Sequence, residues 1–415
     1  MNFNTPFNKP TTLLMILFAC IVFFDAAKAA DREAPRFHNA APLDVPQTAF
    51  AHKASGDPHK IGLILPLTGE NEAFGRRALD AVLLGSGVFD AGSNNPLTLI
   101  IEDSKSRREA AEKAVAKLAD VDGVIGIIGP LEGLGDEAAA QKAQQLRIPI
   151  LTLTAKKGIT DVGEYVFRNF MTDEMQVKSL VKYATGELGS IRFAVLYPDN
   201  FYGQEMKELF RSEVLHSGGK IMIMQSYNAS QTDFRDVIPA LTAGKNTPDD
   251  PKETLLKRAI PFDTLFIPDS YANFRLIAAQ LMMQGIQGIQ LLGTNALHHP
   301  DMLKAGQAHL EGVIFTDGFF LNSYRPEVND FSDLYYASYG REPDFIDAIA
   351  FDTIKIFTGI LRGRKTDTRE KFREELLKLN SHHGVTGTIS SMKQRSAKKE
   401  AFILSVTNGQ IIQVK

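Results

Sequence analysis

The chain has 415 residues, which is more than one compact core usually supports, so a protein of about two domains is expected. Hydrophobic residues make up 44% and charged residues 23%, and this composition excludes disorder for most of the chain. A formal net charge of -3, spread along the sequence, provides no basic surface for a nucleic acid, so we expect no nucleic-acid partner.

The N-terminus is typical of an exported protein. A lysine precedes an apolar run at residues 13–24, and Ala27-Lys28-Ala29 offers small residues to a signal peptidase, so residues 1–29 are predicted to be a signal peptide. The run is shorter than the roughly 20 apolar residues that span a bilayer. We therefore expect a soluble periplasmic protein after cleavage near Ala29. A lipoprotein cut before Cys20, the single cysteine, is the alternative.

The next part of the chain predicts an α/β fold. Residues 30–58 are polar and rich in proline and are predicted to form a flexible tether. After them, strand-like apolar runs alternate with amphipathic stretches, one at 107–118, and this alternation predicts mostly parallel sheets flanked by helices. The predicted strands are 61–65, 97–101, 124–128, 148–151, 193–196, 220–224, 264–267 and 289–292.

The C-terminal part predicts a returning tail. Residues 402–406 and 410–414 flank Thr407-Asn408-Gly409, and Asn-Gly between apolar runs is the strongest short signal for a hairpin. Residues 241–258 are polar, with glycine and proline, and are predicted to be a surface insertion. The sequence therefore predicts two α/β halves followed by a C-terminal tail that forms the hairpin at residues 402–414.

A glycine-rich loop at residues 129–135 joins a buried strand to a helix expected to begin near Asp136. Such a loop lets backbone N–H groups approach a ligand, although a tight turn without a ligand has the same composition. Residues 133–138 fit the dinucleotide-binding pattern, but no acidic residue follows about 20 positions later, and a P-loop is absent from the sequence. We expect no cofactor.

The sequence contains no recognisable motif for catalysis or for metal binding. The pairs His298-His299 and His382-His383 lack the spacing of metal ligands, and we interpret them as solvated loop histidines. No G-x-S-x-G, zincin or cysteine nucleophile follows the signal peptide, so a non-enzymatic protein is expected, with a hydrolase as the minor alternative. Tyr202 and Tyr271 follow predicted strands, where open α/β sheets bind ligands, although packing is the other interpretation.

The order and spacing of several short motifs resemble the leucine/isoleucine/valine-binding receptor family of the type I periplasmic binding protein superfamily. The motifs are residues 61–69, Phe74-Gly75, Gly129-Pro130, Tyr202-Gly203 and Glu311-Gly312. The resemblance implies two lobes, three interlobe crossovers, a ligand in the cleft and delivery to an ABC-transporter permease. It places the crossovers near 168–171, 294–295 and 388–396. The first lobe would then comprise 59–169 and 296–388, and the second 170–295 and 389–415.

Other segments look most like a branch of this family that is often labelled penicillin-binding protein activator. That label implies a regulatory receptor that contacts a cell-wall synthase and acts on peptidoglycan synthesis. Transport and regulation both remain open at this point. The segments are residues 76–79, 167–170, 265–269, 291–295 and 317–320.

The resemblance also assigns residues to the ligand site. The aromatic residue that lines the family's cleft matches Phe74, and its two cleft tyrosines match Tyr202 and Tyr271. Hydroxyl groups could come from Thr152 and Thr154. A carboxylate near the second lobe could come from Asp269.

Three positions depart from the family's pattern. The serine that holds an amino-acid carboxylate falls at Gly133, its threonine partner at Lys156, and the acidic residue for the amino group at Asn295. An ammonium group without an anionic partner is costly to bury, and Lys156 adds a positive charge. We therefore expect an amino-acid-like or anionic ligand and weak binding of leucine, isoleucine and valine.

Overall fold

The computed structural model describes residues 56–88, 97–131, 133–242, 260–303, 308–363 and 366–415. The predicted signal peptide, Cys20, most of the tether and nearly all of the predicted insertion lie outside these ranges. Within them, no helix is both long enough and apolar enough to cross a membrane.

The first sheet has five parallel strands in the order β2-β1-β3-β4-β5. Its central strand β3 is buried along its whole length, because its isoleucines and valine meet helices on both faces. Helices α1, α8 and α9 pack on one face, and α2 and α3 pack on the other. The strands are β1 (Asp57–Leu65), β2 (Thr98–Asp103), β3 (Val124–Leu131), β4 (Ile150–Leu153) and β5 (Val166–Arg168), and the helices are α1 (Glu72–Ser86), α2 (Arg108–Ala116), α3 (Asp136–Gln145), α8 (Phe345–Gly363) and α9 (Arg369–Leu377).

The second sheet has seven strands in the order β14-β13-β10-β9-β8-β6-β7. The strands from β7 to β10 are parallel, and the tail adds the antiparallel hairpin of β13 and β14. Helices α4 and α5 pack on one face and α6 on the other. The strands are β6 (Arg192–Pro198), β7 (Lys220–Tyr227), β8 (Thr264–Phe266), β9 (Gln290–Gly293), β10 (Ile314–Asp317), β13 (Phe402–Thr407) and β14 (Gln410–Gln413), and the helices are α4 (Asp173–Gly186), α5 (Phe201–His216) and α6 (Tyr271–Met283).

All eight predicted strands and the tail hairpin are present, with shifted ends. β1 begins at Asp57, so the predicted tether ends earlier than residue 58, and β3 continues through Leu131 into the predicted glycine loop. The predicted helix at 107–118 is α2, extended by a π-helical turn (Lys117–Val121). The prediction missed the short strands β5 and β10 and the two-stranded sheet of β11 (His382–Gly384) and β12 (Gly387–Ile389).

The chain passes between the two sheets three times, as the resemblance implies. The first crossover follows β5, and the third leads from β12 to β13. These two segments lie side by side, because the Arg168 N–H donates to the Arg395 carbonyl (2.7 Å) and the Ala397 N–H donates to the Arg168 carbonyl (2.9 Å). Both crossovers fall close to their predicted positions.

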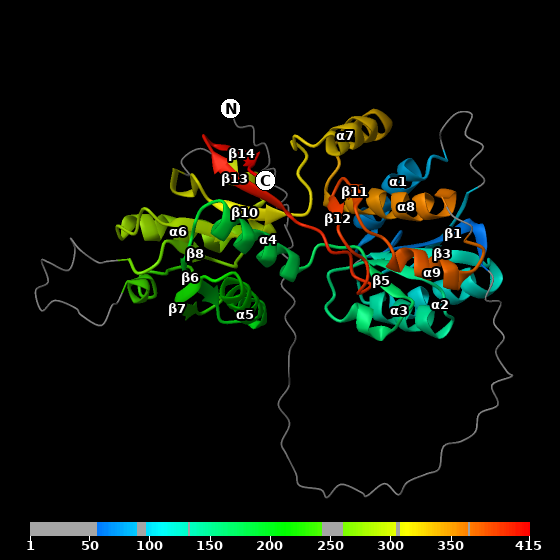
Figure 1. Cartoon of the computed structure of the whole chain (residues 1–415), viewed down its shortest axis with the longest axis horizontal. Coiled ribbons are helices and arrows are strands. Elements are labelled where there is room, and N and C mark those ends of the chain that lie inside the picture. The colour runs from blue at the N-terminus through cyan, green and yellow to red at the C-terminus, as the bar shows by residue number, and fades with distance from the viewer. Residues whose placement is uncertain (1–55, 89–96, 132, 243–259, 304–307, 364–365) are drawn as a thin grey trace, which may run out of the picture. The chain divides into compact units, whose positions relative to one another are not determined.

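The second crossover is not where the resemblance placed it. β10 pairs with β9 and β13 in the second sheet, so the chain leaves this sheet only after Asp317. Residues 318–325 then lead to α7 (Pro326–Tyr339) and to α8, which packs alongside α1 (Figure 1). The assignment of residues 296–317 to the first lobe is therefore wrong. A buried strand of only four residues carries too little pattern to be recognised in a sequence.

Candidate ligand-binding site

The sequence-predicted residues gather at the carboxyl ends of the strands. In the first sheet β1 lies between β2 and β3, so the chain turns in opposite directions after β1 and after β3. Such a switch point opens a crevice for ligands beyond the strand ends. Phe74 follows β1 and Gly133 follows β3, so these two residues flank the switch point. Thr154 and Lys156 follow β4 at the same edge.

The second sheet has a switch point of the same kind. β6 lies between β7 and β8, so the loops after β6 and β8 flank the crevice. Tyr202 follows β6, while Asp269 and Tyr271 follow β8. Asn295 follows β9 at the same edge. The structure thus divides the predicted residues into two groups, one at each switch point.

Two glycines explain why Phe74 and Tyr202 stand at these edges. A Cβ atom on Gly75 would lie 2.1 Å from the Pro66 carbonyl oxygen, and one on Gly203 would lie 2.0 Å from that of Pro198. Each helix therefore begins directly against the end of the preceding strand, where only glycine fits. The preceding aromatic side chain is left at the surface, with 51% of Phe74 and 36% of Tyr202 exposed.

Replacing Gly203 by alanine should lower the free energy of unfolding by roughly 1–3 kcal/mol, because the added methyl group overlaps the Pro198 carbonyl. Urea unfolding followed by circular dichroism measures this change. Gly186→Ala is the control, since nothing lies within 4 Å of its Cβ position at the end of α4, and it should leave stability unchanged or raise it by up to about 1 kcal/mol. Equal stability of the two variants would contradict the close approach.

The first-lobe hydroxyl groups are less available than the sequence suggested. Thr152 and Thr154 are fully buried. The Thr152 hydroxyl donates to the Phe167 carbonyl at 2.8 Å, so its proton is used within the lobe. Thr154 accepts from the Lys156 N–H at 3.2 Å and keeps its own proton for another partner. Thr154 is therefore the better candidate for a ligand contact.

The ammonium group of Lys156 is paired within the first lobe. It lies 2.8 Å from the carboxylate of Glu137, in the first turn of α3. This hydrogen bond, together with the charge of Lys156, lowers the pKa of Glu137. The Gly133 N–H donates to Asp136 at 3.1 Å in the same turn. The pairing with Glu137 removes the main reason for expecting Lys156 to attract an anion.

Tyr202 forms a neutral wall of the second switch point. Its hydroxyl donates to that of Thr294 at 3.4 Å. Burial raises the pKa of Tyr202 to about 12, and the nearby carboxylates of Asp173 and Asp269 add to this effect, while the Thr294 bond opposes it. The phenol is therefore protonated at neutral pH.

Asp173, which the sequence did not single out, brings a carboxyl group close to Tyr202. It is the first residue of α4, after the N-cap Thr172, whose side chain accepts from the Met175 N–H. Burial raises the pKa of Asp173, and the negative charges of Glu205 and Glu174 raise it further. The charge of Lys157, which pairs with Glu205, opposes this shift, but the carboxylates outnumber the lysine, so this edge favours an ammonium group over an anion. The N-cap threonine directly after the first crossover was the only signal in the sequence.

The other predicted residues of the second lobe have partners of their own. The Asp269 carboxylate accepts from the Tyr227 hydroxyl and from the Asn273 amide at 3.0 Å. Tyr271 is buried, and its hydroxyl donates to the Asp301 carbonyl at 2.9 Å. Asn295 is exposed and is held through its backbone N–H, which donates to Gln176 at 3.1 Å. Of these residues, Asn295 presents its side chain to solvent.

His298 and His299 lie in a loop and stay partly exposed, as expected, but both have partners, whereas His382 and His383 belong to strand β11, so the loop interpretation is wrong for that pair. The His298 imidazole bonds to the Asp317 carboxylate, and the His299 ring stacks on Tyr271 with 4.9 Å between centroids. In the part of the chain that the structure describes, no three His, Cys, Asp or Glu side chains are grouped so that they could hold a metal ion.

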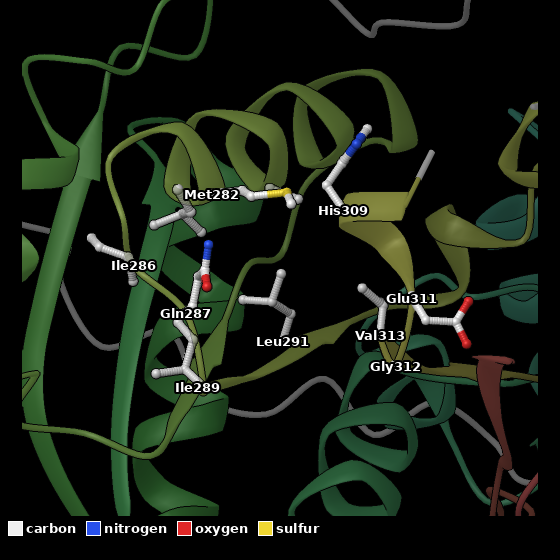
Figure 2. A pocket seen from close by; sticks show the side chains of 12 residues that line it. Met282, Ile286, Gln287, Ile289, Leu291, His309, Glu311, Gly312 and Val313 are labelled. Atoms are coloured by element: carbon white, nitrogen blue, oxygen red, sulfur yellow. The ribbon is translucent and has the colours of Figure 1, made fainter. Parts of the chain in front are cut away.

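Three cavities are lined by none of the candidate residues described above. One, of about 230 Å³, lies at the amino ends of β9 and β10, where Met282, Leu291 and Val313 form apolar walls beside His309 (Figure 2). It is at the opposite edge of the sheet from Tyr271. The other two, of about 430 and 620 Å³, adjoin the second crossover and share His298 and Ile411 as lining residues.

Two α/β sheets joined by three crossovers, with candidate contacts at both switch points, define a two-lobed ligand-binding fold. The family model described as periplasmic binding protein matches residues 58–410, and the chain belongs to this family. Comparison with curated proteins gives no match.

Solved structures show the same fold. A protein of Rhodospirillum rubrum, assigned to a branched-chain amino acid ABC transporter, is 22% identical with a TM-score of 0.76, covering 86% of this chain and 99% of that one. A leucine-binding protein of Thermotoga maritima is 23% identical, with a TM-score of 0.58 and coverage of 86% and 97%. A solute-binding protein of Rhodopseudomonas palustris, in complex with 3,4-dihydroxybenzoic acid, is 19% identical, with a TM-score of 0.57 and coverage of 85% and 95%.

Proposed function

We propose that this protein is an extracytoplasmic, non-enzymatic solute-binding receptor, which closes on a small molecule and presents it to an ABC-transporter permease. The observation that carries the proposal is the placement of Phe74 and Gly133 at one switch point and of Tyr202 at the other. Membership of the periplasmic binding protein family supports both the function and the location outside the cytoplasm.

The fold suggests how closure would occur. A ligand would first bind at one lobe, and rotation about the crossovers would then bring the second lobe onto it. Phe74 and Tyr202 would supply the apolar walls. The N–H groups near Gly133, the Thr154 hydroxyl and the Asn295 amide would orient polar groups of the ligand. Closure would change the outer surface that a permease contacts.

The charges at the site favour an amino-acid-like ligand over an anionic ligand. Lys156 is neutralised by Glu137, whereas Asp173 adds a carboxyl group beside Tyr202. An ammonium group of a ligand would find a partner in Asp173 although Asn295 stands where the family has an acid. Similar structures contain leucine, isoleucine or aromatic acids, so both chemical classes belong in a ligand screen.

Addition of the cognate ligand should raise the melting temperature of the mature protein and reduce its radius of gyration. At 100 times the dissociation constant, binding stabilises the folded state by about 2.7 kcal/mol. We would screen amino acids, their N-acetyl derivatives and hydroxybenzoates by thermal shift, then measure small-angle scattering with each compound that binds. Asp173→Asn should weaken binding of the amino acids at least tenfold and leave N-acetyl compounds unaffected.

Two outcomes would contradict the proposal. Native mass spectrometry of gently purified protein that shows no bound molecule, together with no response to the whole panel, would argue against a solute receptor. Co-purification of a cell-wall synthase with a ligand-indifferent protein would favour the regulatory alternative.

Phe74→Ala and Tyr202→Ala should each weaken binding of the ligand, because both side chains are exposed at the switch points.

A further inference from the structure

We propose a second small-molecule site in the cavity of about 430 Å³ beside the second crossover. The ligand would be a neutral molecule with an apolar body and an amide or hydroxyl group, held by His298 and His299. This volume lies within the range of roughly 300–1,000 Å³ that is typical of small-molecule sites. None of the candidate cleft residues lines this cavity, although His299 stacks on Tyr271, so the proposal is argued from other side chains than the proposed function.

His298 is oriented as a hydrogen-bond acceptor. Its Nδ1 atom bonds to the buried Asp317, whose other carboxylate oxygen accepts from the Gly318 N–H. Because the carboxylate is the acceptor of this bond, Nδ1 carries the proton in the neutral tautomer of the ring, and Nε2 is then an acceptor. Among the described residues, none bonds to this Nε2 atom. It is therefore left for a ligand that donates a hydrogen bond.

His299 has the opposite orientation. The Asp301 N–H donates to its Nδ1 atom at 3.1 Å, so the proton of the neutral ring is on Nε2, which is a donor. Stacking on Tyr271, with 6° between the ring planes, fixes the imidazole. In their neutral forms, the two adjacent histidines thus offer one acceptor and one donor, and both residues line the cavity. An amide or a hydroxyl group is complementary to this pair.

The remaining walls select an uncharged ligand. They are mainly apolar, and the two carboxylates that line the cavity are already paired. Asp317 bonds to His298, and Asp344 forms an ion pair with the Arg77 guanidinium at 2.8 Å. A charged ligand would lose its hydration without gaining a free counter-charge. The apolar walls are Pro300, Phe319, Leu321, Pro343, Phe345 and Ile411.

The site includes residues from both sides of the second crossover. Phe319 and Leu321 belong to the crossover itself, and Phe345 begins α8 on the first-lobe side. A Cβ atom on Gly318 would lie only 2.4 Å from the Phe345 ring, so the crossover backbone packs directly on this residue. Phe345 also packs edge-to-face on Phe170 of the first crossover, 5.1 Å between centroids. The cavity is therefore built from well-packed residues.

Benzamide, benzoate and benzylamine test the proposal, because they share size and shape but differ in charge. Titrations at pH 8, followed by the NMR signals of the histidine rings, should show saturable shifts of His298 and His299 with benzamide. Its dissociation constant should be at least tenfold lower than those of the two charged compounds. Equal affinity for all three probes, or no shift of either histidine, would overturn the proposal.

Variants separate this site from the cleft and from general effects on folding. His298→Phe removes the acceptor, and Leu321→Trp fills the cavity, so each should weaken benzamide binding at least tenfold while the circular dichroism spectrum stays unchanged. His216→Phe, at the exposed end of α5, is the matched control and should bind as the parent protein does. Tyr202→Ala should also retain benzamide binding. Loss of binding in Tyr202→Ala with retention in His298→Phe would place benzamide in the cleft and refute the proposal.

Discussion

An Asp347→Ala variant should be about 3–5 kcal/mol less stable than the parent protein, because it breaks a buried ion-pair network. Asp347 has no exposed surface, and its carboxylate contacts Arg77 and, at 3.6 Å, Arg341. It also accepts from the Tyr335 hydroxyl and from the Asp344 N–H at 2.8 Å. Removal of the carboxylate leaves these donors without their shared partner.

The same change should weaken ligand binding in the cleft. Arg77 lies in α1, three residues after Phe74, and without Asp347 it loses its buried partner and keeps the more exposed Asp344, so the turn that holds this aromatic side chain is held less firmly. Urea unfolding measures the stability, and the thermal-shift screen measures the binding. Asp80→Ala is the control, since Asp80 pairs with Arg341 at the surface, 35% exposed, and should cost no more than about 1 kcal/mol. A similar loss of stability in both variants would show that the burial of Asp347 contributes nothing to the free energy of unfolding.

The strands were predictable because each is a continuous apolar run, and burial of parallel strands on both faces requires such runs. The position of β10 could not be predicted from the sequence. Ile314–Asp317 is short and follows two 3-10 turns, Pro300–Leu303 and Ala308–Leu310, which carry no strong period. Its place in the sheet depends on pairing with β13, almost 90 residues later, and such pairing leaves no local signal.

In the candidate site, too, adjacent sequence explains the position of some residues, and contacts between distant residues explain the rest. Phe74 and Tyr202 follow from a strand, a glycine and a helix start that are adjacent in the sequence. The partner of Lys156 is Glu137, 19 residues earlier, and that of His298 is Asp317, 19 residues later. These pairs decide which charges remain for a ligand, and only the fold brings them together.

The stability of the parent protein should rise with pH between about 8 and 10.5, because of a buried lysine beside the first and third crossovers. Lys399 donates to Thr386 at 2.7 Å and to Asn169 at 3.3 Å, and it is almost wholly buried. Burial lowers the pKa of Lys399 from 10.5 to about 8, while the charge of Asp352 opposes this shift. Below pH 8 the folded state carries the cost of a buried ammonium group.

The sign follows from the protons bound in each state. Between the folded pKa of about 8 and the unfolded value of 10.5, the unfolded chain binds more protons, so raising the pH favours folding. From pH 7 to pH 9.5 the gain in the free energy of unfolding should be about 2 kcal/mol. Lys399→Met should lack this gain, whatever its stability at pH 7, because its side chain does not titrate.

Urea unfolding at pH 7.0, 8.0, 9.0 and 9.5 measures the difference between the parent protein and Lys399→Met, in which other titrating groups cancel. The series stops at pH 9.5 because tyrosines, which have an ordinary pKa near 10, ionise above it. Lys182→Met is the control, since the Lys182 ammonium pairs with Glu400 and is 55% exposed, and its pH dependence should match that of the parent. If Lys399→Met also gains about 2 kcal/mol by pH 9.5, the lysine is not the source, and its ammonium group is accommodated without cost between the crossovers.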